Sequence, residues 1–138
     1  MGKKYLIPYM YAMDRVTKGD VDLVLSEMVR LEMFKTNLNA TNEVTFSKVL
    51  MQSNVEKISV NLKIVNIASD VQKEANRVLK GKLLRTIDAV HLATAIYAKA
   101  DEFYVEDGDL LTLNGLLKMY STPRIIHPPR NRILTLGT

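Results

Sequence analysis

The chain has no cysteine and no tryptophan, and only two histidines, four prolines and six glycines among its 138 residues. The absence of cysteine excludes disulfide bonds, thiolate nucleophiles and cysteine zinc sites. With His91 and His127 as the two imidazoles, the ligands of a histidine-rich zinc site are missing as well. There is also no phosphate-binding glycine loop and no GxSxG motif. Any metal would therefore have to be held by oxygen ligands.

The sequence also lacks a long uncharged apolar run. No stretch reaches the roughly 18 apolar residues that a membrane helix needs. The apolar segment YLIPYMYAM is followed at once by Asp14 and Arg15, without a small-residue cleavage site. We therefore expect a cytoplasmic protein that is not bound to a membrane. With 138 residues and 47% hydrophobic content, we expect a single domain over residues 1–138.

Positive charge is concentrated in one short stretch. The chain has a net charge of +4 and a pI near 9.3, a modest indication of an anionic partner such as nucleic acid. Residues 73–85 contain five basic residues and one acid, which leaves the same net charge of +4. The basic residues are Lys73, Arg77, Lys80, Lys82 and Arg85. We interpret them as a nucleic-acid-binding face, although charge alone favours a solvated helix surface equally well.

Acidic residues stand in otherwise apolar segments at three places. Asp88 lies in RTIDAVHLATAIYA and Asp107 in EFYVEDGDLLTL. Glu32 lies in SEMVRLEMF, where Met28 and Val29 precede it at helical spacing. A buried charge is costly unless it is paired, so three such acids are candidate ligands of a divalent cation. Carboxylate oxygens suit Mg²⁺ or Mn²⁺.

Each of these acids also has an interpretation that needs no metal. Asp88 would interact favourably with the macrodipole at the start of a helix and pair with Arg85. Asp107 and Asp109 would belong to a solvated turn, because DGD is common turn chemistry. Glu32 would form a surface ion pair with a neighbouring cation. From the residues alone, both interpretations stay open.

The hydrophobic pattern predicts strands that alternate with helices. Strands are expected over 21–26, 56–60, 103–105 and 124–126. Helices are expected over 8–19, from Ser26 as N-cap through Glu32, and over 41–52, 62–80, 87–99 and 110–120. This order predicts an α/β fold, a three-layer α/β/α sandwich with a central parallel sheet. Because ligands of such folds bind at the carboxyl ends of the strands, Asp107 is expected at the functional edge.

These segments together resemble the PIN-domain family, small metal-dependent ribonucleases that include the VapC-type toxins of toxin–antitoxin pairs. The most specific stretch is TIDAVHLATAIYAKADEFYVEDGDLLTL, which is similar to the family's Asp-Ala-x-His-Leu-Ala-x-Ala helix, following strand and acidic turn. Upstream, GDVDLVLSEMVRLEM resembles the strand, serine and helix that deliver the second acid. The ending RIIHPP resembles the closing strand, so the resemblance spans nearly everything from Gly19 onward.

The resemblance implies an endoribonuclease that hydrolyses RNA phosphodiester bonds with Mg²⁺ or Mn²⁺. It carries Glu32, Asp88 and Asp107 over as metal ligands, with Asp109 as a more peripheral catalytic acid and Ser26 as a supporting residue. The partners that it implies are RNA, an antitoxin protein and a second copy of the chain in a homodimer.

The chain departs from the family's pattern at two places. Val105 stands two residues before Asp107, where the family usually has Thr or Ser. The family also opens with a strand that ends in an Asp central to the metal site. We interpret the chain as lacking this strand, because KKYLIPYMYAMDRVTKGD is similar to the helix that normally follows it. Asp14, the nearest acid, falls within that expected helix.

Either the start codon is misassigned or the protein is a degenerate member of the family. Three hypotheses about function stay open. The first is a metal-dependent endoribonuclease of PIN type, and the second is a catalytically weakened PIN domain that binds RNA or a partner protein. The third is an unrelated α/β domain whose acidic turn has no catalytic role. A missing central strand would also expose sheet edges, and dimerisation is one way to cover them.

Overall fold

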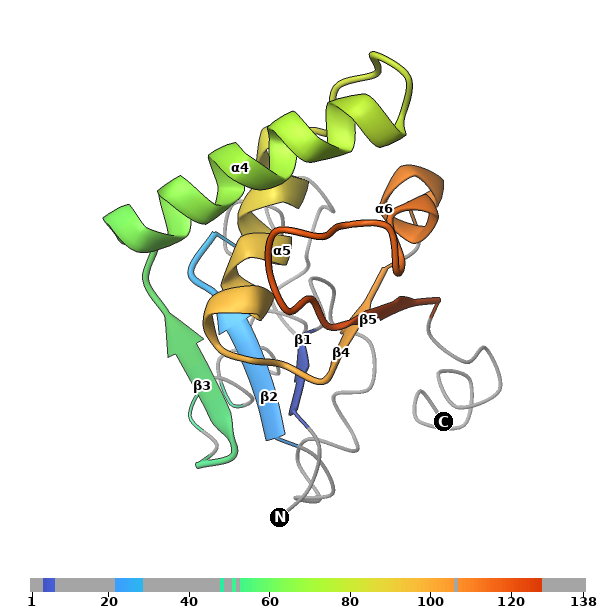
Figure 1. Cartoon of the computed structure of the whole chain (residues 1–138). Coiled ribbons are helices and arrows are strands. Elements are labelled where there is room, and N and C mark those ends of the chain that lie inside the picture. The colour runs from blue at the N-terminus through green and yellow to red at the C-terminus, as the bar shows by residue number, and fades with distance from the viewer. Residues whose placement is uncertain are drawn as a thin grey trace, which may run out of the picture.

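The computed structural model describes residues 4–6, 22–28, 48, 51, 53–105 and 107–127. Five short strands form one sheet in the order β3-β2-β1-β4-β5, and every neighbouring pair is parallel (Figure 1). The strands are β1 (Lys4–Leu6), β2 (Asp22–Ser26), β3 (Val55–Ile58), β4 (Glu102–Tyr104) and β5 (Arg124–Ile126). The chain builds outward from β1 to β3, then crosses to β4 on the other side of β1. The strand order therefore reverses between β1 and β4.

The first strand corrects an expectation drawn from the sequence. Residues 4–6 do not begin a helix but form the central strand, with Tyr5 paired to Leu23 on one side and to Glu102 on the other. The sheet thus has its central strand, and the argument for dimerisation from a missing strand no longer holds. The family's acid is still absent, because Asp14 is the first acidic residue of the sequence.

Helix α4 (Leu62–Val78) follows β3 and has one apolar stripe. It begins at the N-cap Asn61, whose side-chain oxygen accepts a 2.9 Å hydrogen bond from the backbone N–H of Ile64. The buried apolar residues recur at helical spacing: Ile64, Ile67, Ala68, Val71 and Ala75. The sequence prediction of this helix is confirmed, within two residues at its carboxyl end.

Helix α5 (Thr86–Tyr97) is buried nearly all round. It contacts β1 and β2, and α4 packs against it from outside (Figure 1). Ala89, Leu92, Ala93 and Ala95 are fully buried in the core that α5 shares with α4 and the strands. Apolar residues on every face are typical of a helix enclosed in this way, as the sequence predicted. The other expected helical layer of the sandwich falls outside the described residues.

Helix α6 (Gly108–Thr112) is shorter than the predicted helix over 110–120. After Thr112 the chain continues in turns and passes Gly115, whose φ of +75° a helix does not accommodate. The predicted helices over 8–19 and beyond Ser26 lie outside the described residues, as does most of 41–52. Among the helices that the structure describes, none is long and apolar enough to cross a membrane.

Candidate functional site

Three of the candidate acids, Asp88, Asp107 and Asp109, lie at the carboxyl edge of the sheet. The end of helix α5 leads into the amino end of β4. The first turn of α5, which contains Asp88, therefore lies at the carboxyl edge of the sheet. Asp107 comes three residues after β4 and reaches the same edge from the other direction. The edge beside β1 and β4 is where the strand order reverses, and open α/β sheets bind their ligands at such a point.

Asp88 forms a two-point ion pair with Arg85. The Nε atom of Arg85 lies 2.8 Å from one carboxylate oxygen of Asp88, and its Nη2 atom lies 3.3 Å from the other. The Asp88 side chain is only 6% exposed, whereas that of Arg85 is 62% exposed. Asp88 also stands in the first turn of α5, where the helix dipole favours a negative charge. The interpretation of Asp88 as a helix-start acid paired with Arg85 is confirmed.

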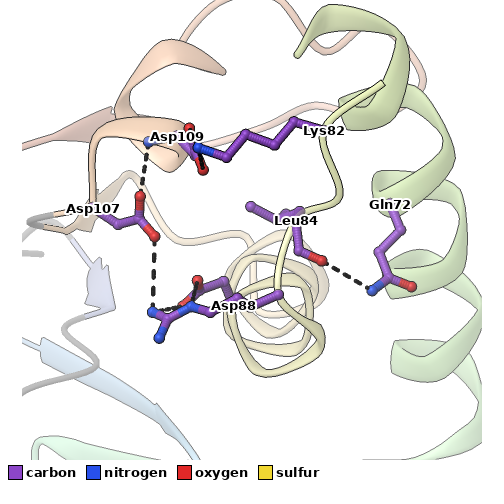
Figure 2. Close-up of polar contacts among 7 residues, drawn as sticks. Gln72, Lys82, Leu84, Asp88, Asp107 and Asp109 are labelled. Atoms are coloured by element: carbon purple, nitrogen blue, oxygen red, sulfur yellow. Dashed lines mark hydrogen bonds and ion pairs between the residues drawn. The ribbon is translucent and has the colours of Figure 1, made fainter. Parts of the chain in front are cut away.

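The same guanidinium reaches Asp107. Its Nη2 atom lies 3.8 Å from Oδ2 of Asp107, while Oδ1 accepts a 2.8 Å hydrogen bond from the backbone N–H of Asp109 (Figure 2). Asp107 is thus the N-cap of α6 and a partner of Arg85 at once. Two carboxylates from separate segments therefore converge on one cationic group.

Asp109 is paired with Lys82, which lies with Arg85 in the segment between α4 and α5. The Nζ atom of Lys82 lies 3.0 Å and 3.2 Å from the two carboxylate oxygens of Asp109. Figure 2 shows Asp88, Asp107 and Asp109 gathered around the segment between α4 and α5. We call the segment over residues 82–85 the cationic loop, because its cations Lys82 and Arg85 contact these acids.

The fold holds the cationic loop in place at both ends. Just after α4, Lys80 and Gly81 have positive φ, and the N–H of Gly81 donates to the carbonyl of Asn76, which completes a Schellman C-cap. Between the two cations, Leu84 is buried in the core, and its carbonyl accepts a 3.4 Å hydrogen bond from the side chain of Gln72. The loop backbone is therefore anchored while its two charged side chains reach the acids.

The five predicted RNA-binding residues separate into two groups. All five are exposed, and Lys73, Arg77 and Lys80 follow one another along the last turns of α4 and its C-cap. Arg85 instead contacts two predicted metal ligands, Asp88 and Asp107, and Lys82 contacts the peripheral acid Asp109. RNA binding by either group stays a prediction.

Ser26 ends β2 at the same edge. It is buried, and its hydroxyl oxygen accepts a 3.2 Å hydrogen bond from the N–H of Met28, which fits the supporting role expected of it. Glu32, the third expected metal ligand, lies outside the described residues. Within the described ranges, no three His, Asp or Glu side chains are close enough together to hold a metal ion. A three-carboxylate site would thus need an acid from outside the described ranges, and Glu32 is the one that the sequence predicts.

Sequence reasoning missed the contact between Arg85 and Asp107. The spacing of three residues on one helix start favours the pair with Asp88. Nothing local in the sequence indicates that a guanidinium at 85 also reaches an acid beyond β4. The anchoring of the loop by Gln72 was likewise not predicted, because it depends on how α4 and α5 pack.

Comparison with known proteins finds a shared fold. No family model matches the chain, and no curated protein matches it. Among solved structures, the chain is similar to one in the crystal structure of VapBC2 from Rickettsia felis bound to a DNA fragment from their promoter. The TM-score is 0.57 at 14% identity, and the match covers 91% of this chain and 99% of that chain. The two chains therefore share a mixed α/β fold.

Proposed function

We propose that this chain is a metal-dependent endoribonuclease of PIN type and the toxin of a VapBC-like toxin–antitoxin pair. One observation carries the proposal: Asp88 and Asp107 converge on a single cationic group at the sheet edge where the strand order reverses. The fold shared with a chain of VapBC2 supports it. The proposal includes the three-layer sandwich of the resembling family.

The donor chemistry of the site fits a hard divalent cation. Asp88 and Asp107 offer carboxylate oxygens, and the guanidinium of Arg85 marks a position between them that already favours positive charge. Proteins often hold Mg²⁺ by one or two carboxylates and several waters. In the proposal Asp88, Asp107 and Glu32 hold the ion, and Asp109 lies further out. A bound Mg²⁺ or Mn²⁺ would supply Lewis acidity and charge neutralisation for phosphodiester hydrolysis.

The proposal also assigns surfaces to RNA, to an antitoxin protein and to a second copy of the chain. Lys73, Arg77 and Lys80 present cations to solvent and would contact RNA phosphates. An antitoxin protein would cover the site, and a homodimer stays part of the proposal. RNA as substrate implies action in the cytoplasm.

A specific observation favours a second candidate function. No acid follows β1 before Asp14 in the sequence, although β1 lies at the centre of the sheet beside the site. The acids that remain already have cations from the cationic loop. Both features suit a catalytically weakened PIN domain that binds RNA or a partner protein without turnover.

Cleavage of a mixed structured RNA with Mn²⁺, with and without EDTA, tests the proposal. We expect cleavage that EDTA stops and that Asp88→Asn or Asp107→Asn abolishes. Asp101→Asn is the matched control, because Asp101 is an exposed acid at the amino end of β4 and should leave cleavage intact. Cleavage that survives both site variants would refute the metal site. RNA binding without cleavage would establish the second candidate.

The partner is tested through the neighbouring genes. If a small adjacent gene encodes an antitoxin, its product should co-purify with the chain and suppress the EDTA-sensitive cleavage. A neighbour that binds without affecting cleavage would contradict the toxin–antitoxin part of the proposal.

A further inference from the structure

We infer that Arg85 is an internal competitor of the divalent cation, and that it couples metal binding to the binding of RNA phosphate. The inference rests on the proposed function and deepens it. It starts from the two contacts of one guanidinium, at 2.8 Å to Asp88 and 3.8 Å to Asp107. These are the carboxylate oxygens that a metal at this edge would take.

The guanidinium and a metal ion cannot both occupy this position. A bound Mg²⁺ needs oxygen ligands at about 2.0–2.1 Å, and it would use lone pairs that Arg85 now engages through Nε and Nη2. Two cations held between the same carboxylates would also repel each other. Metal binding therefore requires Arg85 to leave.

Exposure decides which partner moves. The Asp88 side chain is 6% exposed and stands in the first turn of α5, so it has little room to turn away. The Arg85 side chain is 62% exposed and can leave for solvent without disturbing the core. Its departure without a replacement would strand a buried charge, which is costly. Without metal, the site thus keeps Arg85 in place.

A phosphate is the natural second partner of the released guanidinium. The fork of an arginine matches phosphate oxygens as well as carboxylate oxygens. An RNA phosphate that takes Arg85 frees the carboxylates for metal, and a metal that takes the carboxylates frees Arg85 for RNA. By linkage, each ligand raises the affinity of the other by the same factor.

Mn²⁺ binding, followed through the paramagnetic resonance of the free ion, tests the competition without any cleavage. We expect Arg85→Gln to bind Mn²⁺ about tenfold more tightly than the native chain, a typical size for a coupling between sites. The gain should disappear in the Arg85→Gln/Asp107→Asn double variant. The matched control is Arg124→Gln, which removes a guanidinium lying 3.2 Å from Glu102 at the amino ends of β4 and β5.

The coupling is tested with a 2′-O-methyl phosphorothioate oligonucleotide, which keeps the backbone charge and resists hydrolysis. It should raise the Mn²⁺ affinity of the native chain about fivefold and that of Arg85→Gln much less. An equal effect on both proteins would overturn the coupling.

The outcomes separate this inference from the proposed function. Equal Mn²⁺ affinity of Arg85→Gln and the native chain overturns the inference, even if the native chain cleaves RNA. Tighter Mn²⁺ binding by a folded Arg85→Gln variant supports the inference, even if neither protein cleaves RNA and the proposed function fails. Circular dichroism of each variant verifies that it is folded.

Discussion

The phenolic hydroxyl of Tyr120 donates a 2.6 Å hydrogen bond to the carboxylate of Asp70, 50 residues earlier in the chain. This hydrogen bond, with smaller contributions from burial and from the charge of Asp70, raises the pKa of Tyr120 above its ordinary value of 10.0. Nearby, the buried carboxylate of Glu74 accepts a hydrogen bond from the backbone N–H of Lys118. Two acids of α4 thus hold the segment that follows α6.

The raised pKa gives a prediction for alkaline solution. Asp70→Asn should return the pKa of Tyr120 toward 10.0, as measured by phenolate absorbance, with Tyr120→Phe identifying its titration step. Because the folded pKa is raised, the stability gained from this tyrosine is complete below the unfolded pKa of about 10 and is lost as the pH rises through the folded value. An unchanged titration step in Asp70→Asn would contradict the assignment.

The capping role of Asp107 can be separated from its charge. Asp107→Ala removes the side chain that accepts the 2.8 Å hydrogen bond from Asp109, so it should lower the free energy of unfolding by about 1 kcal/mol. Asp107→Asn keeps an acceptor at the N-cap and should cost much less. Urea unfolding of both variants measures the difference. Equal losses would show that capping is unimportant here, whereas the expected result makes Asp107→Asn a folded protein for the cleavage assay.

Lys99 offers a gain in stability. Its φ of +57° at the end of α5 lies in the left-handed region, where its N–H donates to Ile96 and that of Ala100 to Ala95. Relief of about 1–2 kcal/mol of strain in Lys99→Gly, less about 0.5–1 kcal/mol of added chain entropy, predicts a net gain of about 0.5–1 kcal/mol. Lys99→Ala keeps the strain and should show no gain. Thermal unfolding compares the two variants.

The exposed cations of α4 predict a salt-dependent contact with RNA. Replacing Lys73, Arg77 and Lys80 with Gln should weaken RNA binding and lower the slope of log K against log salt by about 2, at roughly 0.7 per phosphate contact with a single strand. Fluorescence anisotropy at several salt concentrations measures the slope.

The control for this experiment removes the same charge elsewhere. A variant with Gln at Lys57, Lys63 and Arg124, three exposed cations on β3, α4 and β5, loses three positive charges as well. If it lowers the slope equally, RNA senses only the net charge and the face over residues 73–80 is not a binding surface.

The helices and strands whose buried apolar residues follow a clear sequence pattern were predictable. Helix α4 follows from the 3.6-residue period and α5 from a stretch that is apolar nearly all round, and β5 coincides with its predicted range. Strand β1 was missed because three residues are too few to show alternation, and its place depends on pairing with β2 and β4. Helix α6 was predicted too long because the buried Leu113 and Leu117 keep helical spacing, although Gly115 between them is at positive φ.

The sequence predicted the pair of Asp88 with Arg85, but not the cationic partners of Asp107 and Asp109. The apolar surroundings of Asp88 and Asp107 indicate two buried or half-buried carboxylates, and parallel topology brings them to one edge. The same sequence placed Arg85 among RNA-binding cations, because clustering of charge says nothing about where each side chain points. Its position between the two acids follows from the packing of the loop between α4 and α5.

The central place of β1 has a consequence for how the chain is made. Tyr5 pairs with Glu102, which the ribosome adds 97 residues later. Until then β1 can pair with β2 but not with β4, so the N–H and C=O groups on one side of β1 have no strand to bond to. Pairing across such a separation is slow compared with helix formation. The sheet is therefore expected to close late, after α4 and α5 have formed, and the early chain is the stage most open to wrong pairing.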